Sequence, residues 1–207
     1  MLTPVVQALL LINGLVFLGE LAYANSLISW FALWPSGLVA PADAATGLPQ
    51  FRPWQVITYA FLHGGVLHLA LNMYALWLFG TRLEALWGSP RFAVYFLSCI
   101  IGAALAQLVV SEITLLQGGS AYPVLGASGG VFGLLLAFGM IFPESKLVLL
   151  FPPIPIKAKW FVIGYGAIEL FAGVTGTVEG VAHFAHLGGM VTGFLLLLYW
   201  RPRPPTK

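Results

Sequence analysis

The chain has 207 residues, of which 59% are hydrophobic and only 8% are charged. Soluble domains carry about 25% charged residues, so this composition excludes an ordinary soluble domain and indicates a membrane protein. The net charge is +2 without a basic run, which argues against nucleic acid as a partner. Cys99 is the single cysteine, so an internal disulfide is excluded and a packing role is expected.

Six apolar stretches are candidates for membrane-spanning helices, since a spanning helix needs about 20 mostly apolar residues. They cover roughly residues 4–22, 62–80, 91–111, 126–142, 160–175 and 182–200, and the breaks between them are rich in glycine and proline. The longest break, about 23–61, contains Trp30 and Trp34 and is expected to lie in the membrane interface. Without an internal repeat or a linker, the sequence predicts one all-α domain over 1–207, a polytopic membrane helical bundle with six transmembrane helices.

Basic residues orient the predicted bundle. With both termini on one side of the membrane, eight of the nine Lys and Arg residues fall on that side: Arg82, Arg91, Lys146, Lys157, Lys159, Arg201, Arg203 and Lys207. Arg52 alone falls on the other side. Because cytoplasmic loops carry the excess of Lys and Arg, the N- and C-termini are predicted to be cytoplasmic.

Polar residues within the predicted spans are functional candidates, because polar groups in a bilayer are costly. These residues are His63, His68, Asn72, Ser128, Glu169, His183 and His186. The second span carries His68 and Asn72 in its outer half, and the fourth and sixth spans begin from the outer side at Ser128 and at 183–186. Spans far apart in the sequence are therefore expected to place polar groups at a similar depth.

Ser128 lies in a Gly-Ala-Ser-Gly-Gly run over 126–130, directly before a helical stretch, where a helix N-terminus favours a developing anion. Taken alone, Ser128 is equally compatible with a helix cap among small residues. Two Gly-x-x-x-Gly pairs, however, let the fourth and sixth spans approach closely: Gly129 with Gly133, and Gly189 with Gly193. Such an approach would bring His186 within hydrogen-bond reach of Ser128, as a serine nucleophile requires of its base.

A dyad is expected rather than a triad, because no acid is placed to complete one. Glu179 falls in a loop, and Glu169, near the middle of the fifth span, has no assigned role. His68 and Asn72 are four residues apart and share a helix face, so they can bind an oxyanion together with the Ser128 N–H. The alternative is a buried His–Asn hydrogen bond that only stabilises the bundle.

Three motifs carry a resemblance to a known family. They are a His…His…Asn pattern over 63–72, a Gly-x-Ser-Gly run over 126–129 and an Ala-His-x-Gly-Gly run over 185–189. In this order and on these spans, they resemble the rhomboid family of intramembrane serine proteases, in its minimal six-span bacterial form. The resemblance covers nearly the whole chain, from Pro4 to Trp200.

The resemblance implies a role for each matched residue. Ser128 would be the nucleophile, His186 the general base, and His68, Asn72 and the Ser128 N–H the oxyanion hole. Supporting roles are implied for Gly126, Gly129, Phe132, His63, Gly189 and Gly193, with Phe132 against the His186 ring. No metal or cofactor is implied, and a hydrophilic cavity is expected to bring water to Ser128.

The resemblance also implies the substrate and the location. The chain would cleave transmembrane segments of single-span membrane proteins near the outer face of a bacterial plasma membrane, from an active site that opens to the outer side. Oligomeric state stays open. Three rival hypotheses remain: a catalytically silent rhomboid-like protein that binds membrane clients, a histidine-ligated haem or metal membrane protein, and a transporter, for which inverted repeats would be expected.

Overall fold

The computed structural model describes residues 2–38, 49–120, 122–148, 153–177 and 181–200. Its long helices are α1 (Pro4–Phe31), α5 (Ser89–Leu116), α6 (Ser128–Ile141), α7 (Ala158–Thr175) and α8 (His183–Tyr199). Between α1 and α5 the chain forms α2 (Gln55–Thr58), the 3₁₀ turn η1 (Tyr59–Phe61), α3 (Val66–Ala75), the π-helical turn η2 (Leu76–Gly80) and α4 (Thr81–Trp87). The strands β1 (Lys146–Val148) and β2 (Pro155–Lys157) pair antiparallel, with Leu147 opposite Ile156.

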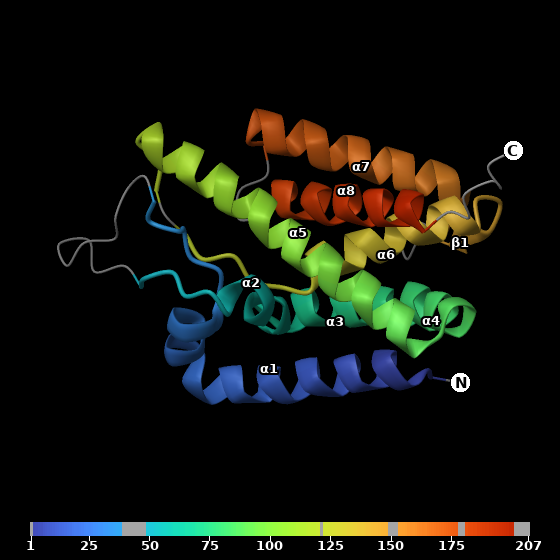
Figure 1. Ribbon diagram of the computed structural model, residues 1–207, viewed down its shortest axis with the longest axis horizontal. Helices are drawn as coiled ribbons and strands as arrows, with labels where there is room; N and C mark the ends of the chain where they lie inside the picture. Colours follow the sequence, from blue (N-terminus) through green and yellow to red (C-terminus); the bar gives the residue numbers. More distant parts are fainter. Residues whose placement is uncertain (1, 39–48, 121, 149–152, 178–180, 201–207) are drawn as a thin grey trace, which may run out of the picture.

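The helices form a bundle with α8 near its centre. Figure 1 shows α1 along one face and α7 along the opposite face, with α5 crossing the bundle obliquely between them. α8 packs mainly against α5 and α6, and α7 covers α8 from outside. The interior between α5, α6 and α8 is therefore where side chains from three distant parts of the sequence meet.

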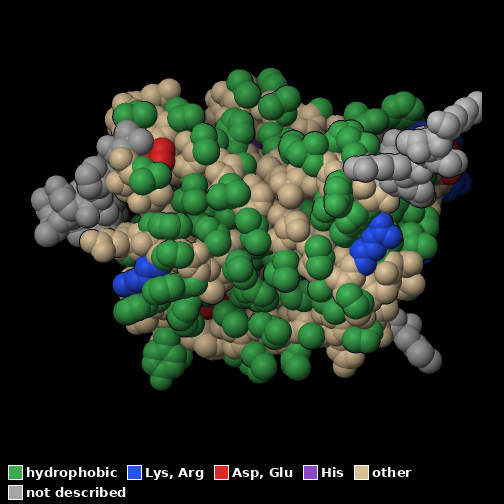
Figure 2. Space-filling model, in the orientation of Figure 1, with side chains coloured by type: hydrophobic (Ala, Val, Ile, Leu, Met, Phe, Trp, Pro, Cys, Tyr) green, Lys and Arg blue, Asp and Glu red, His purple; other side chains and the backbone are tan. Residues whose placement is uncertain are grey.

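The outer surface of the bundle is strongly apolar. Large hydrophobic side chains are exposed on every long helix except α6, and Figure 2 shows them spread over the visible face with few charged side chains among them. On α7 these include Ile163, Phe171 and Val174. A surface of this kind is what lipid solvates, so the fold is an all-α membrane helical bundle.

Two helices of the described residues, α1 and α5, are long and apolar enough to cross a membrane by themselves. The α2–η1 and α3–α4 segments would add a third span, bent by 100° at the break between them. α6 and α8 are apolar but shorter. The count of six spans therefore stays a prediction.

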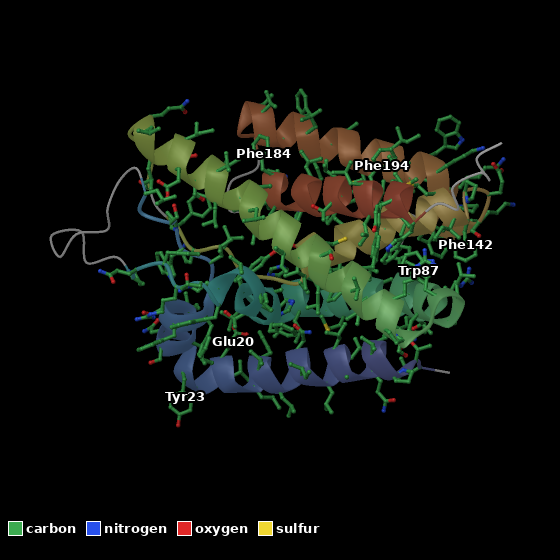
Figure 3. The ribbon with its side chains drawn as sticks, in the orientation of Figure 1. Glu20, Tyr23, Trp87, Phe142, Phe184 and Phe194 are labelled. Atoms are coloured by element: carbon green, nitrogen blue, oxygen red, sulfur yellow. The ribbon has the colours of Figure 1, made fainter. Side chains whose placement is uncertain are left out.

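Three segments differ from the expected spans, of which α5 runs on to Leu116 rather than ending near residue 111. α1 does not end near residue 22 but continues to Phe31 through a kink at Tyr23 (φ −131°, ψ 31°), and Figure 3 shows Tyr23 pointing away from the bundle. In the second expected span, the helix α3 begins at Val66 rather than at residue 62. The buried Glu20 carboxylate accepts the His63 N–H at 3.1 Å and holds the chain before α3 out of the helix.

One end of the bundle gathers the start of α1 and the ends of α4 and α8. The buried Glu84 carboxylate accepts the N–H groups of Val5 and Val6, both at 2.9 Å, and so binds the N-terminus of α1, where a negative charge is stabilising. The Trp87 and Trp200 rings lie 6.0 Å apart at the same end. The start of α1 and the end of α8 therefore lie at the same end of the bundle, and the orientation of the chain in the membrane stays a prediction.

Candidate active site

The segment before α6 is held by backbone hydrogen bonds to elements far away in the sequence. Leu33 and Val124 exchange two N–H···O bonds of 2.9 Å, and the Gly126 N–H donates to the Tyr59 carbonyl at 2.9 Å. Gly126 has φ +126°, a conformation that other residues rarely adopt. A Cβ on Gly126 would also lie 2.8 Å from the His68 ring, so glycine is required there twice over. These contacts fix where α6 begins, at Ser128.

Ser128 and His186 meet across the contact between α6 and α8. The Ser128 Oγ lies 2.8 Å from the His186 Nε2, within hydrogen-bond distance. The approach depends on glycine: a Cβ on Gly189 would lie only 2.8 Å from the carbonyl carbon of Gly129. The two helix backbones are in direct contact at Gly129 and Gly189, as the first glycine of each Gly-x-x-x-Gly pair indicates, whereas a Cβ on Gly193 would meet Tyr95 and Cys99 of α5.

The imidazole of His186 is held flat against an aromatic ring. The Phe132 ring, one turn after Ser128 on α6, stacks on it with ring centroids 4.1 Å apart and an interplanar angle of 7°. The Tyr165 ring of α7 contacts Phe132 in turn, at 5.3 Å. This stack restricts the ring of His186 to one plane, with Nε2 toward Ser128 and Nδ1 toward α7.

A carboxylate lies on the other side of His186. The Oε2 of the buried Glu169 is 2.8 Å from the His186 Nδ1 and 2.7 Å from the His183 Nδ1. The expectation that no acid is placed beside the histidine is therefore wrong. Glu169 is buried because it falls on the inward stripe of α7 with Val162 and Ala172, at helical spacing.

His183 does not occupy the position of the base. Its Nδ1 contacts Glu169, and its ring lies edge-on to the ring of His186 at 6.4 Å. The contact with Ser128 is made by His186, one turn further along α8. The structure therefore gives His183 and His186 a common partner, Glu169, and only His186 an interaction with the serine among the hydrogen bonds of the described residues.

His68 faces the same region from α3. The Gly64 backbone N–H donates a hydrogen bond to the His68 Nδ1, with the two nitrogens 3.3 Å apart. The Nδ1 therefore acts as an acceptor. A neutral ring that accepts at Nδ1 carries its proton on Nε2. That Nε2 is directed at Gly126, because a Cβ on Gly126 would lie 2.8 Å from it and 3.7 Å from the Ser128 Oγ. His68 can therefore donate a hydrogen bond beside Ser128.

Asn72 and His63 complete the polar groups on this side. Asn72 is buried, and its Nδ2 donates one hydrogen bond to the His68 carbonyl at 2.9 Å, which leaves the second hydrogen of the amide for another acceptor. His63 is buried in the break before α3, with its ring 5.1 Å from the ring of His68. A supporting role for His63 stays a prediction.

A cavity of about 880 Å³ opens onto these groups. His68, Asn72, Ser128, Phe132 and His186 all line it, so the predicted site residues share one space. Most of the remaining lining is apolar, and it comes from α3, η2, α6, α7, β1 and the segments before α6 and α8. The expected hydrophilic cavity is wrong in that respect: the lining is polar around Ser128 and apolar elsewhere, which suits a peptide with apolar side chains.

Glu169, His183 and His186 are also the described residues best placed to hold a metal ion, with their ligand atoms within 4.8 Å of one another. A metal such as Zn²⁺ needs about 2.0–2.2 Å to each ligand atom, which keeps the ligand atoms themselves over 3 Å apart. Here one carboxylate oxygen contacts both ring nitrogens at 2.7 and 2.8 Å. The arrangement is that of a hydrogen-bonded cluster, and it would have to expand to take a metal.

Fold and site define a class: a polytopic helical membrane protein with a partly buried serine–histidine pair beside an open cavity. Comparison with known proteins then gives the family, since residues 50–203 match the Rhomboid domain. The chain belongs to the rhomboid family.

Its curated relatives come from several kingdoms. The chain is 33% identical over 147 residues to "Rhomboid protein 1, mitochondrial" of Saccharomyces cerevisiae, covering 68% of this chain and 40% of that protein. It is 33% identical over 147 residues to "Rhomboid protease GluP" of Bacillus subtilis, covering 71% and 26%. It is 34% identical over 186 residues to "RHOMBOID-like protein 4" of Arabidopsis thaliana, covering 87% and 43%. The chain therefore spans less than half the length of each of these relatives.

Proposed function

We propose that the chain is an intramembrane serine endopeptidase that cleaves transmembrane segments of single-span membrane proteins near the outer face of the membrane. The observation that carries this proposal is the 2.8 Å contact between the Ser128 Oγ and the His186 Nε2 at the edge of the cavity. A serine hydroxyl is a weak nucleophile until an adjacent base takes its proton, and this contact supplies the base.

The reaction follows from the groups around Ser128. Ser128 attacks the carbonyl carbon of the scissile peptide bond, and its proton passes to the His186 Nε2. The oxyanion that forms accepts hydrogen bonds from the Ser128 N–H, the His68 Nε2–H and the Asn72 amide. His186 then returns the proton to the leaving amine, and water hydrolyses the acyl-enzyme by the same steps. Loss of one oxyanion donor typically lowers the rate about 10²–10³-fold.

The proposed orientation rests on charge. Eight of the nine basic residues fall on the side of the two termini, which supports cytoplasmic termini and a site that opens to the outer side. A bacterial plasma membrane is proposed from the resemblance to the minimal six-span bacterial form. A cysteine introduced at Thr3 tests the orientation. In sealed cells it should resist a membrane-impermeant maleimide, and labelling from outside would contradict the orientation.

Two alternatives have a definite signature. A catalytically silent rhomboid-like protein would bind membrane clients without cutting them. A metal protein would draw on the cluster of Glu169, His183 and His186. Chelator treatment of the purified protein separates this second alternative, because the serine mechanism should continue unchanged and a metal-dependent activity should stop.

The test uses the purified protein in detergent, a fluorescent fluorophosphonate probe and a model transmembrane substrate. The parent should label and cleave, whereas Ser128→Ala and His186→Ala should do neither. If His183→Ala abolished labelling and His186→Ala kept it, the assignment of the base would be wrong. If the folded parent neither labelled nor cleaved, the client-binding alternative would replace the proposed function.

A further inference from the structure

We infer that Glu169 is a positioning residue of the proposed protease, so that its site works as a Ser128–His186–Glu169 relay rather than as a dyad. This inference rests on the proposed function and deepens it. Its first support is geometric: the Glu169 Oε2 lies 2.8 Å from the His186 Nδ1, while the Ser128 Oγ lies 2.8 Å from the Nε2 of the same ring. The three groups form a continuous line of hydrogen bonds from α7 through α8 to α6.

The carboxylate decides which nitrogen of His186 carries the proton. A base that takes the serine proton at Nε2 must present that nitrogen as an acceptor, so the neutral ring must hold its proton on Nδ1. A carboxylate oxygen at Nδ1 accepts a hydrogen bond from that N–H and has no proton of its own to donate, so it keeps the proton on Nδ1. Once His186 has taken the serine proton, the same carboxylate faces the positive charge of the imidazolium and stabilises it.

His183 supports the same arrangement from one turn earlier on α8. Its Nδ1–H donates to the same Oε2 at 2.7 Å, so Glu169 receives two hydrogen bonds on one oxygen. A buried carboxylate without such donors would be costly, and two imidazole donors offset that cost. His183 therefore holds the carboxylate in place, while Glu169 holds His186.

A purely structural role for Glu169 predicts something different. If the carboxylate only joined α7 to α8, its loss would lower the stability of the protein and weaken substrate binding. A positioning role instead predicts that kcat falls while KM and the melting temperature stay close to those of the parent, because the loss acts on the transition state.

The experiment compares the parent with Glu169→Gln, which is close in shape and removes the charge. In serine proteases that use a triad, this kind of substitution at the acid lowers kcat about 10⁴-fold. Phe132 still holds the imidazole here, so we expect a smaller loss, of about 10²-fold, in kcat and in the rate of fluorophosphonate labelling. The matched control is Glu112→Gln, the same change at a buried carboxylate of α5 that bonds to Ser36 and Gly37.

The outcomes separate the two proposals. If the parent labels and cleaves, and Glu169→Gln does so within threefold of it, the relay is overturned and the protease stands. If the parent does neither, the proposed function fails and the relay with it. Should Glu169→Gln not fold, Glu169→Asp serves in its place: it keeps the charge but retracts it by one methylene, and a folded variant with the parental rate would overturn the relay.

Discussion

Replacing Gly189 by alanine tests whether the approach of α6 to α8 sets the distance between Ser128 and His186. The new Cβ would overlap the Gly129 carbonyl oxygen, its nearest neighbour, and would lie 2.8 Å from the carbonyl carbon. Carbon atoms in ordinary contact are about 3.5–4.0 Å apart and the oxygen is closer still, so the helices must separate by more than about 1 Å. A separation of that size would take the Ser128 Oγ and the His186 Nε2, now 2.8 Å apart, out of hydrogen-bond distance.

Misplacement of reacting groups by about 1 Å can lower a rate about 10²-fold, and overpacking of this kind typically costs about 1–3 kcal/mol of stability. Labelling rate and substrate cleavage are measured together with thermal unfolding in detergent, so that the rate refers to folded protein. Gly14→Ala on α1 is the matched control, because a Cβ there meets nothing within 4 Å. A Gly189→Ala variant that labels at the parental rate would refute the reasoning, since the site would then not depend on backbone contact.

Three further variants probe separate features. Glu84→Ala leaves two N–H groups at the start of α1 without their acceptor, so the free energy of unfolding should fall by about 1–3 kcal/mol, seen as a lower melting temperature with unchanged activity per folded molecule. Phe132→Ala removes a stack of the kind worth about 0.5–1.5 kcal/mol and should slow labelling about 2–10-fold, whereas Phe132→Tyr should restore it. Hydrogen bonds from Lys157 and Lys159 lower the pKa of Glu144 from 4.5 to about 2, so the stabilisation they give is present above pH 4.5 and lost as the pH falls toward 2. Glu144→Gln should therefore melt slightly below the parent at neutral pH and level with it near pH 2, and a difference that persists in acid would contradict this.

The sequence alone predicts that His186 lies within hydrogen-bond distance of Ser128. Glycine at four-residue spacing on two apolar stretches indicates that two helices touch, and the polar residue beside each glycine run is then brought to the contact. His68 is expected near Ser128 because the predicted spans place both residues at a similar depth. The first of these features could be predicted because small residues leave only a few ways for helices to approach.

The role of Glu169 could not be predicted from its surroundings in the sequence. It stands in an apolar helix, and its partners follow 14 and 17 residues later, on another helix. Which side of α7 faces α8 depends on how the two helices are rotated, and one helix pattern does not fix that rotation. The inward stripe of Val162, Glu169 and Ala172 was the available signal.

The break before α3 was missed for a similar reason, since the hydrogen bond from His63 to Glu20 spans 43 residues. Figure 3 shows Glu20 on α1 turned toward that break.

The backbone contact between Gly129 and Gly189 makes the spacing of Ser128 and His186 mechanically stiff, because no rotatable side chain separates the two helices. Glu169 is held differently, at the end of a side chain on α7, whose outward face is apolar and meets lipid. Helices adjust to the thickness of the hydrocarbon layer by tilting. A change in acyl-chain length should therefore move the carboxylate relative to His186 while the serine stays where it is, so bilayer thickness would change turnover and the rate at which Ser128 is labelled together.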